Sequence, residues 1–518
     1  MAAVTADGSP FDPPDDLDRR TAAVRGGVLT LVSRLGVDGV RLVRTAVLSR
    51  LLGPNAFGLM AMTSGSLGIA RVLREGGLST ATVQQPGLTP GQVAASHRIN
   101  AGMGVLLGAA TFVFAPALGA LLREPDIVPI ARVLAITFLL DGFATQHIAV
   151  LARRTDFRSQ SLIEATSASS SLVVAVALAL NGAGVWALVG GMVTSSCVTL
   201  VMARHRSGYR PGRPDWDAQT WAMVRRGLQF VGFALLGFLG QHLHLILIGR
   251  NLGADSAGIY GRAQTAFLLA IGYLTAVPRR VAVPQMSRIN DDPAAFARYF
   301  RRALRAVAVM AAPLAAFAVV HADLVVRLLL GPGWGESARL LAILAVGILV
   351  QPVCAATGWI YIARGDGKRM LRWGVVGWSA QIGGALAGLP FGAVGVAIGY
   401  TAALVLITPP CLWYAFRGTL LTTPVALGDV ARPLVLAVGA VALTVPLQSA
   451  VHLPALLEAL LLAGAFATAY GVGLLAVPGT REVVNDAREI LLAPTLRAVG
   501  SRLGVGTTGK GSESDHDR

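Results

Sequence analysis

Cysteine and charged residues are both scarce in this chain. Its 518 residues include three cysteines, Cys197, Cys354 and Cys411, which lie far apart in apolar segments and form no C-x-x-C pair. This spacing argues against a disulfide framework or a zinc site and favours small buried hydrophobic residues. Charged residues make up only 14% of the chain. Because a soluble domain has about 25%, a water-soluble fold is not expected.

Catalytic signatures are also missing. No P-loop, no dinucleotide fingerprint in a βαβ setting and no Ser/His/Asp pattern can be placed in the sequence. The longest hydrophilic stretch inside the chain, 205–222, is too short for a catalytic domain outside a membrane. His242 and His244 are two residues apart, so a helix directs them to opposite sides, which argues against a shared metal site. We therefore predict no enzymatic activity, no catalytic residue, no bound metal and no cofactor.

Long apolar runs dominate what is present. Hydrophobic residues make up 54% of the chain, and the mean hydropathy is +0.62. Continuous runs of about 20 apolar residues predict transmembrane helices, whereas the strands of a membrane β-barrel would alternate. We therefore predict an all-α integral membrane protein with about 14 transmembrane helices. These are expected near residues 24–47, 57–80, 96–122, 126–152, 160–181, 184–204, 223–249, 257–278, 297–320, 335–363, 371–390, 393–416, 431–449 and 455–477.

The net charge of +16 is distributed over the predicted loops in a regular way. Arginine and lysine cluster in alternate loops, near 153–158, 204–213, 279–288 and 364–369. The loops between them are nearly empty of basic residues, so the positive-inside rule makes the basic loops cytosolic. Both termini are then cytosolic, with 1–23 and 478–518 as disordered tails and no cleaved signal peptide. Since the charge reports topology, nucleic acid is not an expected partner.

A short motif occurs twice at a spacing of 200 residues. Residues 48–60 read LSRLLGPNAFGLM and residues 248–260 read IGRNLGADSAGIY, so both contain R-x-L-G-x4-G. An even number of helices separates the copies, which predicts two six-helix lobes of the same orientation, a parallel repeat. The expected segments are an N-lobe at 24–205, a cytosolic linker at 206–222, a C-lobe at 223–416 and two extra helices at 431–477.

Several stretches of the sequence resemble one known family. RLLGPNAFGLMAM, REGGLSTATVQQPGLTPGQV, GRNLGADSAGIYGRAQ and LLGPGWGESARLLAILAVGILVQP are similar, in this order, to the Wzx-type oligosaccharide flippases. These belong to the multidrug/oligosaccharidyl-lipid/polysaccharide exporter superfamily, and the resemblance covers about residues 25–415.

That resemblance implies a bacterial inner-membrane protein that moves an undecaprenyl-diphosphate-linked oligosaccharide to the periplasmic leaflet. The glycan would serve O-antigen, capsule or exopolysaccharide synthesis. Transport would proceed by alternating access of two lobes around a cationic cavity. Besides this lipid-linked substrate, the candidate partners are membrane lipids, a polysaccharide polymerase and a chain-length regulator.

Ionisable residues inside the apolar runs are costly, and they mark a cavity or an ion pair. On the first predicted helix, Arg34, Asp38 and Arg41 share one face, and Arg44 lies beside them. The alternative to cavity lining is an internally paired stripe, or snorkelling to the membrane surface. The charged residues near the cytosolic end of the second helix serve either substrate entry or local pairing and snorkelling, and Arg262 of the eighth helix is a further candidate for the cavity lining. The predicted substrate-binding residues are Arg34, Asp38, Arg41, Arg44, Arg71, Arg74, Glu75, Arg262 and Gln264.

Three other functions stay open at this point. A drug or small-solute antiporter of the same superfamily would prefer acidic residues for cations, whereas arginine outnumbers carboxylates on the first two helices. A flippase of the peptidoglycan lipid precursor would handle a similar lipid diphosphate. A membrane-embedded polysaccharide polymerase or glycosyltransferase would need a large outer loop or a catalytic domain outside the bilayer, and the short loops argue against both.

Overall fold

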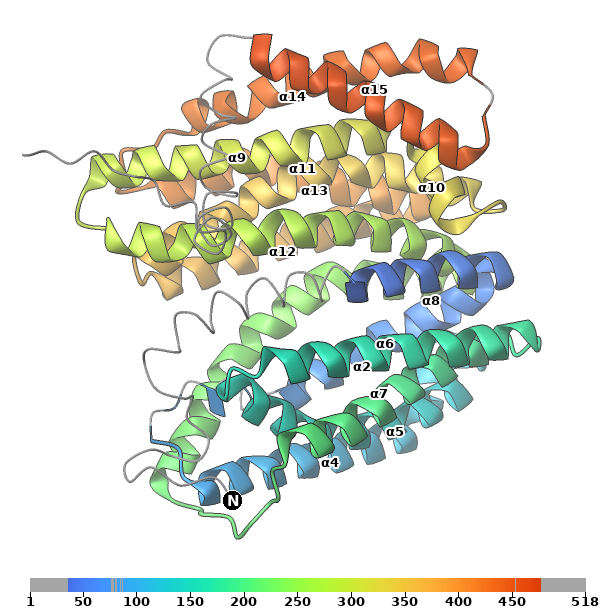
Figure 1. Ribbon diagram of the computed structural model, residues 1–518, viewed down its shortest axis with the longest axis vertical. Coiled ribbons are helices and arrows are strands. Elements are labelled where there is room, and N and C mark those ends of the chain that lie inside the picture. The colour runs from blue at the N-terminus through green and yellow to red at the C-terminus, as the bar shows by residue number, and fades with distance from the viewer. Residues whose placement is uncertain are drawn as a thin grey trace, which may run out of the picture.

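The computed structural model describes residues 36–75, 79, 82–83, 85, 87–451 and 453–476, with side chains except at 226–230, 233 and 277. A first helix covers 36–51. The other helices, labelled as in Figure 1, are α2 (Pro54–Glu75), α4 (Pro90–Leu122), α5 (Ile127–Arg153), α6 (Phe157–Leu180), α7 (Val185–Ser207), α8 (Ala218–Arg288), α9 (Pro293–Val320), α10 (Ala322–Leu330), α11 (Gly335–Ala363), α12 (Gly367–Gly388), η1 (Leu389–Phe391), α13 (Gly392–Phe416), α14 (Thr423–Ala450) and α15 (Ala455–Ala476). These ranges contain no strand, and the predicted all-α class is confirmed.

Two elements differ from the sequence prediction. α8 runs through both helices expected at 223–249 and 257–278, and its only non-helical residue is Gly253, with φ 87° and ψ 169°. Glycine tolerates this positive φ because it has no Cβ, so the chain turns there within a single residue. The short helix α10 was not expected, since its nine residues are too few to cross a membrane.

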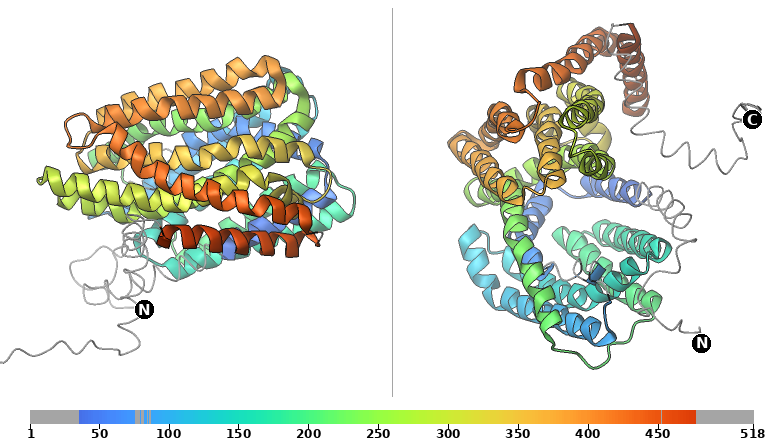
Figure 2. Two further views of the ribbon diagram at one scale, coloured as in Figure 1. Left: turned by 90° about the horizontal axis from the view of Figure 1, so that it is seen from above. Right: turned by 90° about the vertical axis from the view of Figure 1, so that its left-hand side faces the viewer.

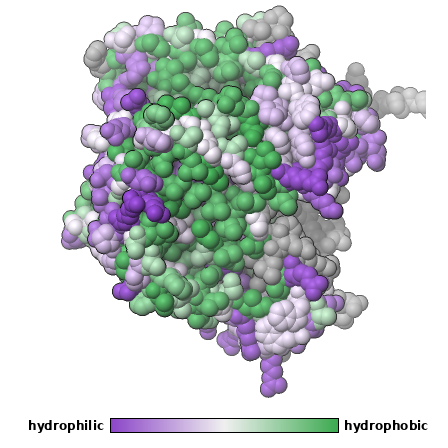
Figure 3. Space-filling model, turned by 180° about the vertical axis from the view of Figure 1, so that it is seen from behind, coloured by the Kyte–Doolittle hydropathy of each residue, from purple (hydrophilic) through white to green (hydrophobic). Residues whose placement is uncertain are grey.

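The molecule has the surface of a membrane-spanning protein. Eleven helical segments of the described chain are long and apolar enough to cross a bilayer. Gly367–Phe416 contains two of the predicted helices, and Ala234–Arg288 contains one and most of another. The first helix is described only over 36–51, which is shorter than a full span. Figure 3 shows a broad hydrophobic band between hydrophilic edges, as a bilayer requires.

The helices form two bundles with the first helix between them (Figures 1 and 2). One bundle contains α2, α4, α5, α6 and α7, and the other contains α9, α11, α12 and α13, while α8 packs against both, on α2 and on α11. α8 leads from the first bundle into the second, and α14 and α15 lie outside it. This arrangement confirms the predicted two-lobe architecture with two additional helices.

The two copies of the repeated motif meet at the interface between the lobes. A Cβ atom added to Gly58 of α2 would lie 1.7 Å from the carbonyl oxygen of Ala254. One added to Gly258 would lie 2.0 Å from the carbonyl oxygen of Pro54. Pro54 and Ala254 are themselves equivalent in the repeat, so the contact is symmetric. Small residues let helix backbones approach closely, which is a main source of helix association in membranes.

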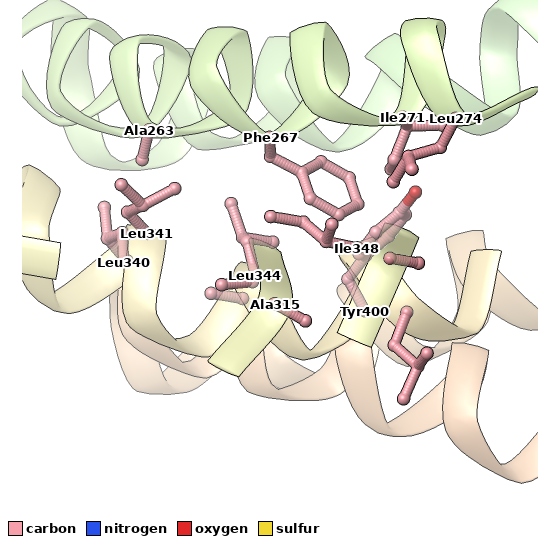
Figure 4. Packing of buried hydrophobic residues seen from close by; sticks show 14 of the residues in the cluster. Ala263, Phe267, Ile271, Leu274, Ala315, Leu340, Leu341, Leu344, Ile348 and Tyr400 are labelled. Atoms are coloured by element: carbon pink, nitrogen blue, oxygen red, sulfur yellow. The ribbon is translucent and has the colours of Figure 1, made fainter. Parts of the chain in front are cut away.

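The C-lobe is held together by interdigitated apolar side chains (Figure 4). Phe267 and Ile271 of α8 point toward Leu344 and Ile348 of α11, and Tyr400 of α13 lies beside them. All five side chains are buried. In lipid such contacts stabilise mainly through close packing, because the surrounding acyl chains are equally apolar.

Polar contacts fasten the two C-terminal helices to α9. Asp429 of α14 is buried and accepts hydrogen bonds of 2.8 and 3.1 Å from Arg301. The His321 ring bonds Gln448 at 2.8 Å and Thr444 at 2.7 Å. The Tyr470 hydroxyl of α15 donates to the carbonyl oxygen of Val309 at 3.0 Å. α14 and α15 are therefore joined to the C-lobe rather than to the N-lobe.

Candidate functional site

A cavity of about 210 Å³ lies in the N-lobe, close to the end of the bundle that carries Pro54 and Gly253. We call this end the repeat end. The first helix, α2, α6 and α7 line the cavity, and α8 of the other lobe adds one residue. Its lining includes Arg44, Phe57, Ser64, Ser171 and Arg262. Two of the residues predicted from sequence, Arg44 and Arg262, therefore come together here from different lobes.

The cavity is positively charged and has unused hydrogen-bonding capacity. The Arg262 guanidinium lies over the Phe57 ring, 4.4 Å from its centroid, which is a cation–π contact. Its buried Nε has no hydrogen-bond acceptor in the described part of the chain. Arg44 donates from Nη1 to the Ser171 hydroxyl at 3.0 Å. No Asp or Glu of the described residues lines this space, so an anion is the ligand that would complete it.

The rest of the polar stripe on the first helix forms a link to α8. Arg41 Nη1 and Asp38 Oδ1 are 3.2 Å apart, and Arg41 keeps 59% of its side chain exposed. Asp38 Oδ2 accepts a hydrogen bond of 2.5 Å from the Tyr273 hydroxyl. Asp38 therefore joins the two lobes as well as pairing with Arg41. Arg34, the fourth residue of the predicted stripe, lies outside the described residues.

The charged residues near the end of α2 are engaged mainly with α5. Arg74 is buried and lies 3.2 Å from Asp141 Oδ2 and 3.9 Å from the exposed carboxylate of Glu75. Arg71 is half-buried. Neither Arg71, Arg74 nor Glu75 lines the cavity that holds Arg44. The ion pairs of Arg74 support the interpretation that these residues pair locally, as a structural feature of the helix end.

Gln264 occupies a different environment from Arg262. Its side chain is buried, donates to the Gln241 carbonyl oxygen at 2.7 Å and lies 3.1 Å from the His244 ring nitrogen. It therefore ties the two halves of α8 together and is not part of the Arg44 cavity. Sequence reasoning did not select Phe57 or Ser171 as lining residues. The serine-rich run TSASSS at 166–171, inside an apolar segment, was the available signal for Ser171.

Contacts between the lobes close the repeat end beyond this cavity. Arg50 of the first helix donates to the carbonyl oxygens of Leu328 at 2.8 Å and Leu329 at 3.4 Å, at the end of α10. The Trp334 indole nitrogen donates to the Ser49 carbonyl oxygen at 3.0 Å. Phe57 packs edge-on against the Trp334 ring at 5.6 Å. Residues of both lobes therefore close the cavity at the repeat end.

Two helical lobes joined across a pseudo-symmetric interface, with a cationic cavity that is closed at one end, form the architecture of a multi-pass membrane transporter. Residues 47–339, more than half of the chain, match the family described as polysaccharide biosynthesis protein. The chain belongs to this family, which confirms the family resemblance seen in its sequence motifs.

Named relatives agree with this assignment. The lipopolysaccharide biosynthesis protein WzxC of Escherichia coli is 23% identical over 75% of this chain and 80% of its own. The succinoglycan biosynthesis transport protein ExoT of Rhizobium meliloti is 23% identical over 67% of this chain and 70% of its own.

Solved structures show the same fold. The lipid II flippase MurJ in an inward closed conformation superimposes with a TM-score of 0.67 at 11% identity, covering 86% of this chain and 98% of that one. An inward-facing multidrug transporter of the MATE family, from the MOP superfamily, gives a TM-score of 0.62 at 15% identity, covering 75% and 95%. Because both identities are low, these two likenesses establish the fold alone.

Proposed function

We propose that this chain flips an undecaprenyl-diphosphate-linked oligosaccharide from the cytosolic to the periplasmic leaflet of a bacterial inner membrane. It would act by alternating access, in the synthesis of a cell-surface polysaccharide, with both termini in the cytosol. A polysaccharide polymerase and a chain-length regulator would act on the delivered glycan. The observation that carries the proposal is the cavity in which Arg44 and Arg262 come together without a carboxylate.

The chemistry of that cavity matches a lipid diphosphate. Arginine presents several N–H donors in a planar fork, so it can form paired hydrogen bonds to phosphate oxygens. Arg262 Nε is buried and lacks an acceptor, and a phosphate oxygen would supply one. The cavity contains residues of both lobes, so anion binding there is coupled to the relative position of the lobes. A cationic drug would meet two positive charges and no carboxylate.

A physical barrier explains why such a path is needed. Each sugar hydroxyl or phosphate that entered hydrocarbon without a partner would cost several kcal/mol. A polar cavity for the head group, with the lipid tail left in the bilayer, removes this barrier. Outward movement of each negative charge also gains about 2.3 kcal/mol per 100 mV in an inside-negative membrane.

Flipping assays in vesicles test the proposal. The full chain is reconstituted with undecaprenyl-diphosphate-linked oligosaccharide, and its appearance in the opposite leaflet is measured. We expect Arg44→Ala/Arg262→Ala to slow flipping at least about tenfold, because each lost charged hydrogen bond is worth about 1.5–3 kcal/mol. Arg44→Lys/Arg262→Lys should recover only part of this, since lysine keeps the charge and loses the fork.

The control is Arg432→Ala, because Arg432 is an exposed arginine of α14 far along the chain from the cavity lining. It should flip lipid at the wild-type rate. Wild-type flipping by the double alanine variant, at equal protein level, would refute the proposed site. Lipid II is then added as a competing substrate. Little competition favours a polysaccharide flippase, and strong competition favours a flippase of the peptidoglycan precursor.

A further inference from the structure

A second cavity, of about 280 Å³, lies inside the C-lobe and differs from the first in place and in chemistry. It is lined by α8, α11, α12 and α13. α11 begins beside Trp334, at the repeat end, and its residues 351–361 line the cavity toward the helix's other end. This cavity therefore extends from the middle of the bundle away from the repeat end, where Arg44 and Arg262 lie.

Aromatic rings and side-chain amides line this space. The aromatic residues are Tyr361, Trp373 and Trp378, and the amide residues are Gln241, Gln351 and Gln381. No charged side chain of the described residues is among the lining. An amide offers both donors and acceptors, and an aromatic face offers an apolar surface. The lining suits a neutral ligand with hydroxyl groups on an apolar ring.

Two polar atoms of the cavity lining are buried without a partner. The Gln351 side-chain oxygen and the Tyr361 hydroxyl are both shielded from solvent, and neither has a hydrogen-bond partner in the described part of the chain. Buried polar groups are nearly always hydrogen-bonded in folded proteins. Two such atoms on residues that line one cavity make it a candidate binding site.

The indole rings of the lining are held in place by neighbouring residues. A Cβ atom added to Gly240 would lie 2.6 Å from the Trp378 ring, and one added to Gly237 would lie 3.1 Å from it. Trp373 stacks on Tyr414 with their centroids 5.4 Å apart. Fixed rings can bind a flat ligand face without losing side-chain freedom on binding.

We propose that this C-lobe cavity binds a neutral sugar residue of the lipid-linked glycan. The apolar C–H face of a pyranose ring packs on Trp373 or Trp378, and its hydroxyls bond Gln351 and Tyr361. The inference rests on the proposed flippase function, because such a substrate carries both an anionic diphosphate and neutral sugars. The cationic N-lobe cavity and the uncharged C-lobe cavity then recognise different parts of one molecule.

Gln351→Leu/Tyr361→Phe is the variant that tests this site. It removes the two unpaired polar atoms and changes side-chain volume little, so a purely structural role predicts unchanged or higher thermal stability. Gln160→Leu/Tyr299→Phe is the matched control, since both residues are half-buried and lie outside either cavity. Native mass spectrometry of the full chain measures binding of two probes. These are undecaprenyl diphosphate carrying the host's oligosaccharide, and undecaprenyl diphosphate alone.

We expect wild type to bind the sugar-bearing lipid more tightly than the bare one, and Gln351→Leu/Tyr361→Phe to lose about tenfold of affinity for the sugar-bearing lipid only. The control variant should bind both lipids as wild type does. Unchanged binding of the sugar-bearing lipid by the test variant, or equal wild-type affinity for both lipids, would overturn the sugar site. Failure of the flippase proposal would give a different result. In that case Arg44→Ala/Arg262→Ala would bind undecaprenyl diphosphate as tightly as wild type does.

Discussion

Gly58 and Gly258 are equivalent in the two halves of the chain, and their contacts are reciprocal. Each glycine packs on the residue that lies four positions before the other glycine in the sequence. Gly58 rests on the backbone of Ala254, and Gly258 rests on the backbone of Pro54. The two copies of the motif, which the sequence shows only as a repeat at a spacing of 200 residues, are therefore in direct contact between the lobes. The turn that follows the first helix meets its counterpart within α8, about a pseudo-two-fold axis.

Substitution of either glycine should destabilise this interface. A methyl group at Gly58 or Gly258 would overlap backbone atoms, which cannot move aside as a side chain can. Overpacking of this kind costs about 1–3 kcal/mol, so we expect Gly58→Ala and Gly258→Ala to lower the thermal unfolding temperature in detergent. Gly102→Ala on α4 is the control, because nothing lies within 4 Å of the added atom. An unfolding temperature for Gly58→Ala equal to that of wild type would contradict the close contact.

Arg50 should act as a latch at the repeat end. It is held by two carbonyl oxygens of α10, so Arg50→Ala removes a contact that favours the closed arrangement of the lobes. With Ser64→Cys introduced in the N-lobe cavity, an impermeant thiol reagent added outside should label the Arg50→Ala protein several-fold faster. Arg250→Ala, at the equivalent position of the repeat, is the comparison and should leave the rate near that of the Ser64→Cys parent. Equal labelling rates with and without the Arg50 side chain would show that Arg50 does not hold the repeat end closed.

The predicted topology can be tested with two exposed positions. Asn55 follows the first helix and Arg213 lies in the segment between α7 and α8, and both are exposed. In a cysteine-free background, Asn55→Cys should react with an impermeant thiol reagent in intact cells, and Arg213→Cys only after the membrane is opened. Ser207, at the end of α7, would report on the same side as Arg213 but is unsuitable for labelling because it is buried against His147. Labelling of both positions from outside would overturn the orientation.

The attachment of α14 depends on one buried carboxylate. Asp429 accepts from Arg301 and lies 3.7 Å from Arg305. Asp429→Asn leaves both cations without their charge partner, and we expect a loss of about 1.5–3 kcal/mol, measured as a lower unfolding temperature. Proteolysis of the 417–422 connection should also become faster. Asp323→Asn breaks an exposed pair with Arg327, so it should change stability by less than about 1 kcal/mol. Equal effects of the two variants would argue against a special role for Asp429.

Hydrophobic runs were sufficient to predict the long apolar helices, because every membrane-spanning segment must satisfy its own backbone within the bilayer. α11 was predicted at 335–363 and is observed at Gly335–Ala363. The break expected between 249 and 257 is a single residue, Gly253, because one positive φ is enough to redirect the chain. α10 was missed, since a nine-residue helix at a membrane boundary has no span-length signal.

The site was harder to predict, because helical periodicity gives the face of a residue and not its partner. Arg44 and Arg262 share a cavity although 218 positions separate them in sequence, a contact that only the lobe packing creates. Arg74 was chosen by the same criterion and instead pairs with Asp141. Gln264 was also chosen and bonds to Gln241 and His244. A role in substrate binding stays a prediction for all nine selected residues.

The fastening of α14 and α15 to α9 has a practical consequence for measuring transport. In the proposed alternating access, helices bonded to one lobe at Asp429, His321 and Tyr470 would move with that lobe when it rocks against the other. Much of α15 is exposed and lies at the outer edge of the bundle (Figure 2). A fluorescent donor on α15 and an acceptor on α4 would therefore record the rocking as a change in energy transfer, while both cavities keep their native side chains.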